Sequence, residues 1–419
     1  MDLSVKFGKV RFKNPIIASG GTPTLTSRNM RKCIEAGVAG IEWKSISYDK
    51  GTYHLQRPAS LFLDKFGEPG SAMSWETGFP SPELGLEQLS EIKPLAEKED
   101  VRLILNLDGG NLADWYGSGR TASLEKYCNY AKKLQQAGAD ILQIGLCPIV
   151  GANLGEERFG WLPGYTPEAI KTLRQAGINI PITIKIDETF SSARGTMKTL
   201  EKARVDGMHI GGFMPGTLID IETAKPLAPG APLAYGYGRA RKAYTNYVTS
   251  VASSTSKIPL ASSGGISTTR DVVERLMCGA TLAAVCTAAM YRGYKVFTEM
   301  VRGLEKFMDR KGYQKVAEFI GIAVPYIESH DDFYAFLRQL EVPKDSVTVT
   351  VDPERCNGCE RCMSCLYGAI TMEEGIARID PNVCERCGIC STICPVSAIT
   401  EMPWPYGQAG GGFWGKRAG

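Results

Sequence analysis

The cysteines of this chain are concentrated in one short stretch near its C-terminus. The sequence has 419 residues and 13 cysteines, and eight of these lie between residues 356 and 394. Disulfide scaffolds belong to small secreted chains, whereas a dense cysteine block at one end of a large chain is typical of a metal site. The block therefore predicts a metal-binding domain, and it leaves most of the chain for a separate fold.

The block consists of two runs of four cysteines. The second run has spacings of two, two and three residues and ends in Cys394-Pro395, which is the run of bacterial ferredoxins. In two-cluster ferredoxins the fourth cysteine of each run binds the other cluster. This rule predicts two [4Fe–4S] clusters, one bound by Cys356, Cys359, Cys362 and Cys394, the other by Cys384, Cys387, Cys390 and Cys365.

The first run departs from this pattern. It has one residue fewer before Cys365, and Leu366 stands where proline is usual. The alternative interpretation is a pair of zinc sites, but zinc sites usually show two separated Cys-x2-Cys pairs. The spacing favours iron–sulfur clusters over zinc.

Composition excludes several classes of protein. Hydrophobic residues make up 43% and charged residues 22%, as in a folded globular protein, and the net charge is only +3. Such a weak charge gives no reason to expect a nucleic acid or an anionic membrane as a partner. No apolar run approaches the ~20 residues of a membrane span, and the start of the chain does not resemble a signal peptide. We therefore expect a cytoplasmic protein.

The rest of the chain alternates short apolar runs with amphipathic stretches, many of which end in Gly-Ala or Ala-Gly. Such endings are typical of helices that stop before a strand. Eight strands, each followed by a helix or connection, predict a (β/α)8 TIM barrel; the alternative is an open doubly wound sheet. The expected strands are residues 15–18, 40–44, 103–107, 140–144, 182–186, 207–211, 259–263 and 282–287.

Two of these strands carry lysines near their C-terminal ends. In residues 182–186 the isoleucines alternate with Thr183 and Lys185, so Lys185 should point into the barrel while the isoleucines face the helices. Lys44 holds the same place in its strand. A buried lysine without an anionic partner is costly. The lysines therefore imply an anionic or electron-rich ligand, or pairing with Glu42 or Asp187.

These patterns divide the chain into four parts. We expect the barrel in residues 1–312, a helical connector in 313–345, the ferredoxin-like domain in 346–402 and an irregular tail in 403–419. The tail is rich in glycine and aromatic residues and cannot build a core.

A barrel followed by a two-cluster module resembles the flavin and iron–sulfur part of NAD(P)-dependent dihydropyrimidine dehydrogenase, and the barrel itself resembles the dihydroorotate dehydrogenase family. The matching segments are residues 14–19, 43–45 and 147–148, and Ser263-Gly264-Gly265-Ile266 and Val285-Cys286-Thr287. The resemblance implies bound FMN in residues 1–312, with its phosphate held after the seventh and eighth strands. It assigns FMN contacts to Ala18, Ser19, Lys44, Lys185, Gly264, Gly265, Cys286 and Thr287.

The resemblance also implies a reaction. In the family, FMN exchanges a hydride with one carbon of a C–C bond and a loop cysteine exchanges a proton with the next, which assigns the proton to Cys147 and substrate binding to Asn111. A thiol with an ordinary pKa near 8.5 suits this role. The alternative is that Cys147 is a small buried residue, as we expect for Cys33, Cys128 and Cys278.

The sequence departs from the family where pyrimidines are bound. Ile144 replaces the asparagine three residues before the loop cysteine, Ile149 follows Pro148, and residues 211–216 lack the family's Asn-Thr. Gln143 could supply an amide if the strand slips by one residue. We therefore expect an unsaturated carbonyl compound as substrate, with uracil or thymine as the alternative.

Electrons should pass through the clusters to or from a partner. The resemblance implies a ferredoxin or an NAD(P)H/FAD flavoprotein subunit as that partner, in a homo- or hetero-oligomer. A rival interpretation is an electron-transfer subunit that makes no use of Cys147.

Overall fold

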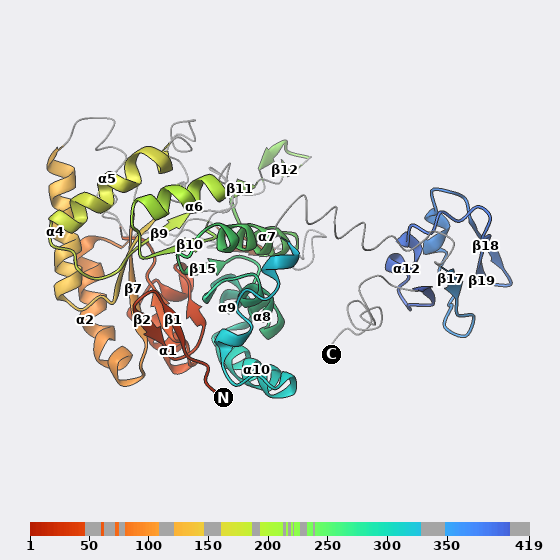
Figure 1. The fold of residues 1–419 in the computed structure, drawn as a ribbon, viewed down its shortest axis with the longest axis horizontal. Coiled ribbons are helices and arrows are strands. Elements are labelled where there is room, and N and C mark those ends of the chain that lie inside the picture. Colours follow the sequence, from red (N-terminus) through yellow and green to blue (C-terminus); the bar gives the residue numbers. More distant parts are fainter. Residues whose placement is uncertain are drawn as a thin grey trace. The chain divides into compact units, whose positions relative to one another are not determined.

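The computed structural model divides the chain into two compact units, Met1–Glu328 and Ser329–Gly419, which are described separately (Figure 1). Asn111, Cys147 and the tail 403–419 lie outside the described residues. The structure describes residues 1–46, 60–62, 72–74, 80–108, 121–145, 161–186, 193–212, 215–216, 219–220, 222–226, 233–237, 239–327 and 348–402.

The first unit is a closed barrel of eight parallel strands, so the predicted TIM barrel is confirmed and the open sheet is wrong. Around the barrel the strand order is β10-β15-β16-β3-β4-β7-β8-β9. Each strand overlaps one predicted apolar run. The strands are β3 (Ile16–Ala18), β4 (Gly40–Glu42), β7 (Arg102–Asp108), β8 (Ile141–Gly145), β9 (Ile182–Ile186), β10 (Gly207–Ile210), β15 (Leu260–Ser263) and β16 (Leu282–Val285).

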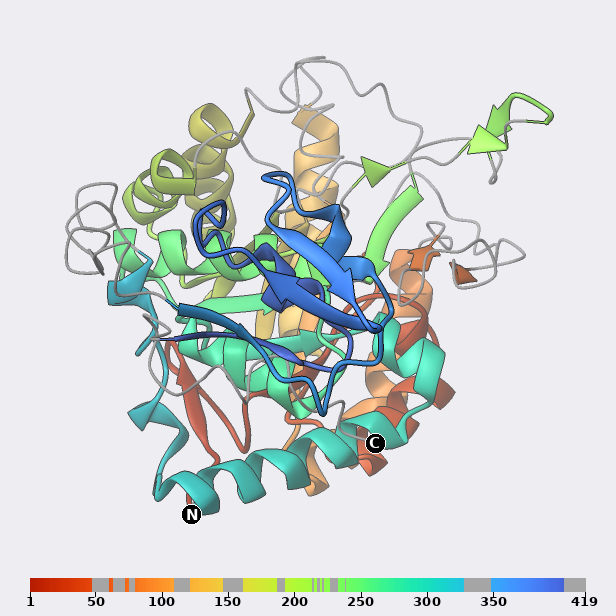
Figure 2. The same ribbon diagram turned by 90° about the vertical axis from the view of Figure 1, so that its right-hand side faces the viewer.

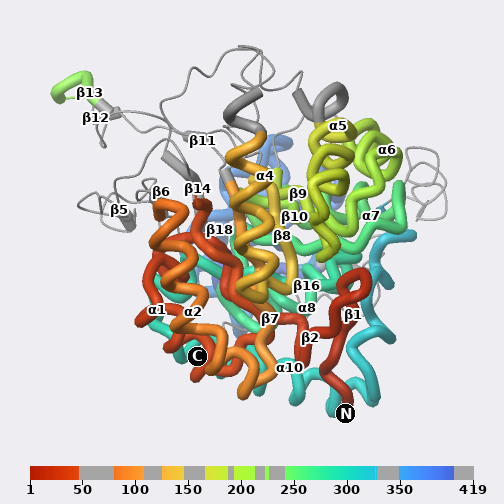
Figure 3. The backbone as a smooth tube through the Cα atoms, turned by 90° about the vertical axis from the view of Figure 1, so that its left-hand side faces the viewer, coloured from red at the N-terminus to blue at the C-terminus, as the bar shows by residue number. Residues whose placement is uncertain are grey.

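Helices follow the barrel strands and form the outer layer (Figure 3). Their apolar faces cover the strands, whose outward side chains are buried. Within the part of the chain that the structure describes, no helix is long and apolar enough to cross a membrane. The helices are α1 (Ser27–Glu35), α2 (Pro82–Lys98), α4 (Thr121–Gln136), α5 (Trp161–Gln175), α6 (Ala193–Lys202), α7 (Arg239–Thr255), α8 (Thr269–Met277), α9 (Thr287–Arg292) and α10 (Lys295–Lys311).

An N-terminal hairpin covers the end of the barrel where the strands begin. It pairs β1 (Val5–Phe7) with β2 (Val10–Phe12), and the rings of Phe7 and Phe12 meet edge to face at 6.4 Å. A Cβ atom on Gly207 or Gly40, the first residues of β10 and β4, would lie within 2.8 Å of these rings. With that end covered, the opposite end, where the strands stop, is left for a binding site.

Further strands come from the connections that follow β4 and β10. Four of them form an antiparallel sheet in the order β11-β14-β6-β5, and two form a separate pair (Figure 3). None of these strands shows a pattern that predicts it from the sequence. They are β5 (Ser60–Phe62), β6 (Ala72–Ser74), β11 (Pro215–Gly216), β14 (Leu233–Tyr237), and the pair β12 (Ile219–Asp220) and β13 (Lys225–Pro226).

After α10 the chain returns to its own beginning. Asp2 forms an isolated bridge with Lys315, and Figure 2 shows the N-terminus beside the end of α10. In the described part of the predicted helical connector the chain forms two 3-10 turns, η4 (Val316–Glu318) and η5 (Val324–Tyr326). Phe319 is fully buried in the barrel unit, so this part packs with the barrel.

The second unit is built from two antiparallel strand pairs and short helical turns (Figure 1). Its small core includes Cys362, Ile370, Ala377 and Ile399. The predicted ferredoxin-like fold is confirmed. The elements are β17 (Thr348–Val351) paired with β20 (Ile399–Met402), β18 (Ile370–Glu373) paired with β19 (Ile376–Ile379), the 3-10 helix η7 (Arg361–Ser364) and α12 (Ile389–Ile393).

One carboxylate organises the start of α8, next to the glycine turn that follows β15. The oxygens of Asp271 accept hydrogen bonds from the backbone N–H groups of Ser267 and Thr268, and the Lys242 ammonium lies 2.7 Å away. Burial raises the pKa of Asp271, but hydrogen bonds from Lys242 and Ser267 outweigh it and hold the pKa below its usual value. Asp271 is therefore ionised near neutral pH and caps the helix.

We expect Asp271→Ala to lower the free energy of unfolding by about 1–2 kcal/mol, because a helix cap and its charged hydrogen bonds are lost. A carboxyl whose pKa falls on folding stabilises the protein above its unfolded pKa of about 3.9 and loses this effect at lower pH. The difference between wild type and variant should thus stay constant from about pH 5.5 to 8. Denaturant titrations across this range test it, and a difference that shrinks towards pH 5.5 would contradict it.

Candidate active site and metal centres

A set of charged side chains lies inside the barrel where the strands end. The Lys185 ammonium on β9 pairs with Oε1 of Glu42, the last residue of β4. In the barrel β4 and β9 are separated by β7 and β8, so this contact crosses the interior. Lys185 therefore points inward, as its alternation predicts. Of the two carboxylates expected to pair with the lysines, Glu42 is the partner seen, while Asp187 lies outside the described residues.

Glu42 also contacts β10 and the loop that follows β3. Its Oε2 lies 2.7 Å from Nδ1 of His209 on β10, and its Oε1 accepts a hydrogen bond from the N–H of Gly20 after β3 at 3.3 Å. Burial raises the pKa of this carboxyl, but His209 and Lys185 outweigh burial and lower the pKa to about 2. Glu42 is thus an ionised carboxylate with no exposure to solvent.

Lys44 and Cys286 lie in the same region. Lys44 follows Glu42 by two residues and is buried, while Trp43 between them points outward and donates its ring N–H to Gln88 on α2 at 3.2 Å. Burial raises the pKa of the Cys286 thiol to about 11, against the charges of Lys185 and Lys44, which act on it from nearby. The ends of β4, β9 and β16 therefore bring both predicted flavin lysines to one place.

The loop after β3 packs directly over these groups. Ala18 and Ser19 are buried, and the Ser19 N–H donates to the carbonyl of Val285 on β16 at 2.9 Å. A Cβ atom on Gly20 would lie 2.7 Å from the carbonyl oxygen of Trp43. Only glycine fits such a close approach. The loop therefore closes one side of the charged region.

The glycine turn after β15 has the form of an anion site. Gly264 and Gly265 have φ angles of +98° and +72°, and a Cβ atom on Gly265 would lie 2.7 Å from Lys242. The fully buried Arg275 donates to the carbonyl oxygens of Ser263 at 2.9 Å and Gly264 at 2.8 Å. Because these carbonyls are held by Arg275, the turn can present N–H groups to an anion. Thr287, after β16, is buried beside this end of the barrel.

Two buried amides lie deeper in the barrel. The register of β7, β8 and β9 pairs Asn106 with Gln143, Gln143 with Thr183, and Gly145 with Lys185. Paired residues share a face, so Gln143 points inward with Lys185, and Ile144 points outward. The Asn106 amide donates to Oε1 of Gln143 at 2.6 Å. Gln143 therefore presents its amide to the interior of the barrel, and Ile144, which replaces the family's asparagine three residues before the loop cysteine, does not.

Several of these residues were not predicted from the sequence. Arg275 and Asn106 were missed; the lone amide of Asn106 in an apolar strand is a signal of a buried polar role, whereas nothing in the sequence separates Arg275 from an exposed helix arginine. His209 on β10 also was not predicted, and it faces Glu42. The predicted residues Asn111 and Cys147 are among those that the structure does not describe.

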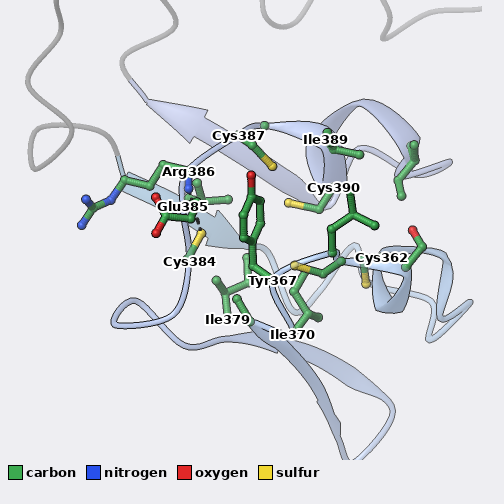
Figure 4. Close-up of a pocket in the computed structure, with 17 residues that line it drawn as sticks. Cys362, Tyr367, Ile370, Ile379, Cys384, Glu385, Arg386, Cys387, Ile389 and Cys390 are labelled. Carbon is green, nitrogen blue, oxygen red and sulfur yellow. Dashed lines mark hydrogen bonds between the residues drawn. The ribbon is translucent and has the colours of Figure 1, made fainter.

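The eight cysteines of the second unit line two cavities. Cys362 lines both cavities. Figure 4 shows Cys362, Cys384, Cys387 and Cys390 in the second cavity with apolar side chains such as Ile370 and Ile379. The first cavity is lined by Cys356, Cys359, Cys362 and Cys394, and the second by Cys362, Cys365, Cys384, Cys387 and Cys390.

Electrostatic interactions between the thiols separate two groups and place Cys362 in the first. Burial, together with the neighbouring Cys384 and Cys387 thiols, raises the pKa of Cys390 to about 11. Burial likewise raises the pKa of Cys362, together with neighbouring thiols that all line the first cavity, those of Cys356, Cys359 and Cys394.

Backbone N–H groups also point at the sulfur atoms, with Arg386 donating to Cys384 at 3.4 Å and Ala398 to Cys394 at 3.2 Å. Four thiols in an apolar cavity, with N–H donors to sulfur, fit the donor set of an iron–sulfur cluster.

Comparisons with known proteins agree with both units. A family model described as dihydroorotate dehydrogenase matches residues 2–308, and one described as a 4Fe-4S binding domain matches residues 377–400. The chain is 28% identical over 330 residues to the catalytic subunit of dihydroorotate dehydrogenase B (NAD(+)) of Pyrococcus abyssi, covering 77% of this chain and 99% of that protein. The Pyrococcus furiosus protein of the same name is 26% identical over 335 residues, with the same coverage.

A further relative extends over both units. The NAD-dependent dihydropyrimidine dehydrogenase subunit PreA of Escherichia coli is 24% identical over 415 residues, which is 95% of each chain. The similarity therefore includes the cysteine block as well as the barrel.

Proposed function

The chain belongs to the dihydroorotate dehydrogenase family, and we propose that it oxidises or reduces a carbon–carbon bond next to a carbonyl group in a substrate other than a simple pyrimidine. It is a flavin and iron–sulfur oxidoreductase that acts on a CH–CH group. The observation that carries the proposal is the gathering of Lys44, Lys185 and the Gly264-Gly265 turn at the ends of the barrel strands. This end of the barrel is where the fold builds its active sites.

The residues at this end fit an FMN. The glycine turn and the segment Cys286-Thr287 would hold its phosphate, and Lys44 and Lys185 would contact its ring, with Ala18 and Ser19 in the loop over it. Bound FMN supplies hydride transfer and exchanges single electrons with the clusters. The chain's own part in the reaction is then to orient the substrate through Asn111 and to move a proton at the Cys147 thiol.

The two cysteine cavities support two [4Fe–4S] clusters with the crossed ligand sets that the spacing predicts. Such clusters carry electrons singly, which calls for a redox partner. We propose a ferredoxin or an NAD(P)H-oxidising flavoprotein subunit in this role. The printed names of the relatives, which refer to NAD and to subunits, support a multi-subunit enzyme.

The inner face of the barrel bears on the choice of substrate. Gln143 points inward, but its carbonyl oxygen accepts the hydrogen bond from Asn106, and residues 211–216 offer no side-chain amide. A site that hydrogen-bonds a pyrimidine needs several such groups, and their loss weakens pyrimidine binding strongly. Dihydropyrimidine oxidation stays as the second candidate, because the relative PreA aligns with 95% of the chain.

Anaerobic purification of the full-length protein tests the proposal. We expect one FMN and about eight iron atoms per chain. The reduced enzyme should then be mixed with uracil, thymine, orotate and a panel of α,β-unsaturated carbonyl compounds, and flavin reoxidation followed by absorbance. Fast reoxidation by the carbonyl compounds alone supports the proposal. Reoxidation by uracil or thymine favours the second candidate, and protein without FMN refutes both.

A further inference from the structure

Glu42 is a buried charge to which the proposed reaction assigns no role. It has no exposure to solvent, and it contacts Lys185 on β9 and His209 on β10. The register of these strands places Lys185 and His209 directly opposite each other. One carboxylate therefore holds two neighbouring side chains from the far wall of the barrel.

The charged groups around Glu42 and Cys286 have an excess of positive charge. Among the described residues, the charges that act on the Cys286 thiol include three cations, those of Lys44, Lys185 and Arg241, and the carboxylate of Glu42. A carboxylate with so low a pKa keeps its charge throughout the neutral range. Replacing it with a neutral group would raise the positive charge of this region by one unit. In a poorly solvated interior such a change acts over several ångströms.

Reduction of a flavin adds negative charge to its ring, so nearby cations favour the reduced form and nearby anions disfavour it. We infer that Glu42 is a positioning residue that fixes Lys185 and His209 and lowers the reduction potential of the bound FMN. The inference rests on the proposed function, because it needs FMN at the ends of the strands. The inference extends that function, because it names the residue that lowers the reduction potential of the bound FMN.

His209 strengthens the argument for a fixed arrangement. Oε2 of the ionised Glu42 lies 2.7 Å from Nδ1 of His209, so the carboxylate contacts the ring directly and orients it. Glu42 also accepts the N–H of Gly20, in the loop that would cover the flavin. A substitution of Glu42 therefore removes contacts to β9, to β10 and to this loop.

The test compares Glu42→Gln with a matched control. Glutamine keeps the size of the side chain and removes its charge. The control is Asp206→Asn, which removes a carboxylate that pairs with Arg174 and accepts the N–H of Ile182. Asp206 directly precedes β10, at the beginning of the same strands. The control therefore loses one charge and one ion pair at the opposite end of the barrel.

The measurement is an anaerobic redox titration of the full-length holoenzyme, with flavin absorbance separated from the cluster signals by electron paramagnetic resonance. We expect Glu42→Gln to favour reduced over oxidised FMN by about tenfold, a rise of about 30 mV for a two-electron couple. Asp206→Asn should leave the potential unchanged. Equal potentials in Glu42→Gln and wild type would overturn the inference.

A second variant covers the case in which Glu42→Gln fails to retain flavin. Lys185→Gln changes the charge in the opposite sense and should lower the potential, and an unchanged potential would overturn the inference. In a double variant the two effects should not add, because both residues act through one ion pair. Wild-type protein that contains no FMN would refute the proposed function instead, so the two failures can be told apart.

Discussion

Replacing Cys147 with serine is expected to reduce turnover by about 10²–10⁴-fold, while FMN and iron contents stay unchanged. The reason is the acidity of the group. A thiol with a pKa near 8.5 can give and take a proton near neutral pH, whereas a serine hydroxyl cannot do so without a strong base. Flavin reduction by dithionite should remain normal, because it does not involve this proton. The measurement is turnover with the substrate found by the flavin reoxidation screen.

A matched control is Cys128→Ser. Cys128 is buried on α4, on the outside of the barrel, and burial raises the pKa of its thiol. Its replacement should cost some stability and leave turnover close to wild type. If Cys147→Ser also turns over at the wild-type rate, the proton does not come from Cys147. The reading of the chain as an electron-transfer subunit would then gain support.

The barrel could be predicted because its strands are buried on both faces. Parallel strands of this kind appear as short apolar runs between glycine-rich helix ends. The run at residues 182–186 matches β9 at both ends, and the runs at 259–263 and 207–211 each differ from their strands by one residue. The prediction that the sheet closes into a barrel depended only on the count of eight such runs.

The additional antiparallel strands could not be predicted in the same way. Strands β11, β12 and β13 have two residues each and show no periodicity. Strands β6 and β14 pair over a long distance in sequence, as in the pairing of Ala234 with Ser74. The segment 314–322 has a helical pattern, yet Gly321 has a φ of +76° and Phe319 packs into the barrel, and only short turns form. Tertiary packing outweighed local propensity there.

The two lysines of the site could be predicted from the sequence, but the inward-facing amide of β8 could not. Alternation placed Lys44 and Lys185 on the inner face, and both are buried there. Spacing to the loop cysteine puts Ile144 at the place of the family's asparagine, but a strand shifted by one residue exchanges its two faces, and Gln143 is the residue that faces inward. A sequence motif gives only the number of residues between a position on β8 and the loop cysteine. Which side chains of β8 face the interior is decided by its hydrogen bonding to β7 and β9. Only the structure shows that Gln143 is the inward residue.

Removal of cluster ligands is the second large effect that we expect. In the crossed arrangement Cys394 shares a cavity with Cys356, although 37 residues lie between them in the sequence. Cys384, which belongs to the same run as Cys394, lines the other cavity. Losing one thiolate should labilise the cluster that it binds. Iron should therefore fall from about eight to about four atoms per chain in Cys394→Ala or in Cys365→Ala.

Double variants distinguish the crossed arrangement from one cluster per run. If the cavities are the sites, Cys356→Ala with Cys394→Ala should lose no more iron than either change alone, because both remove ligands of one cluster. Cys384→Ala with Cys394→Ala should lose nearly all of it. One cluster per run predicts the opposite pair of results. Iron and acid-labile sulfide per chain, measured without air, decide between them.

The same variants should separate the two halves of the reaction. Electrons from a protein partner must cross the clusters, so turnover driven by the partner is expected to disappear in Cys394→Ala and in Cys365→Ala. Flavin reduced by light within the barrel should still be reoxidised by the substrate at nearly the wild-type rate, since the charged region and Cys147 are intact. Loss of both reactions would mean that the cysteine unit also holds the barrel in its active form, and partner-driven turnover at the wild-type rate would remove the clusters from the electron path.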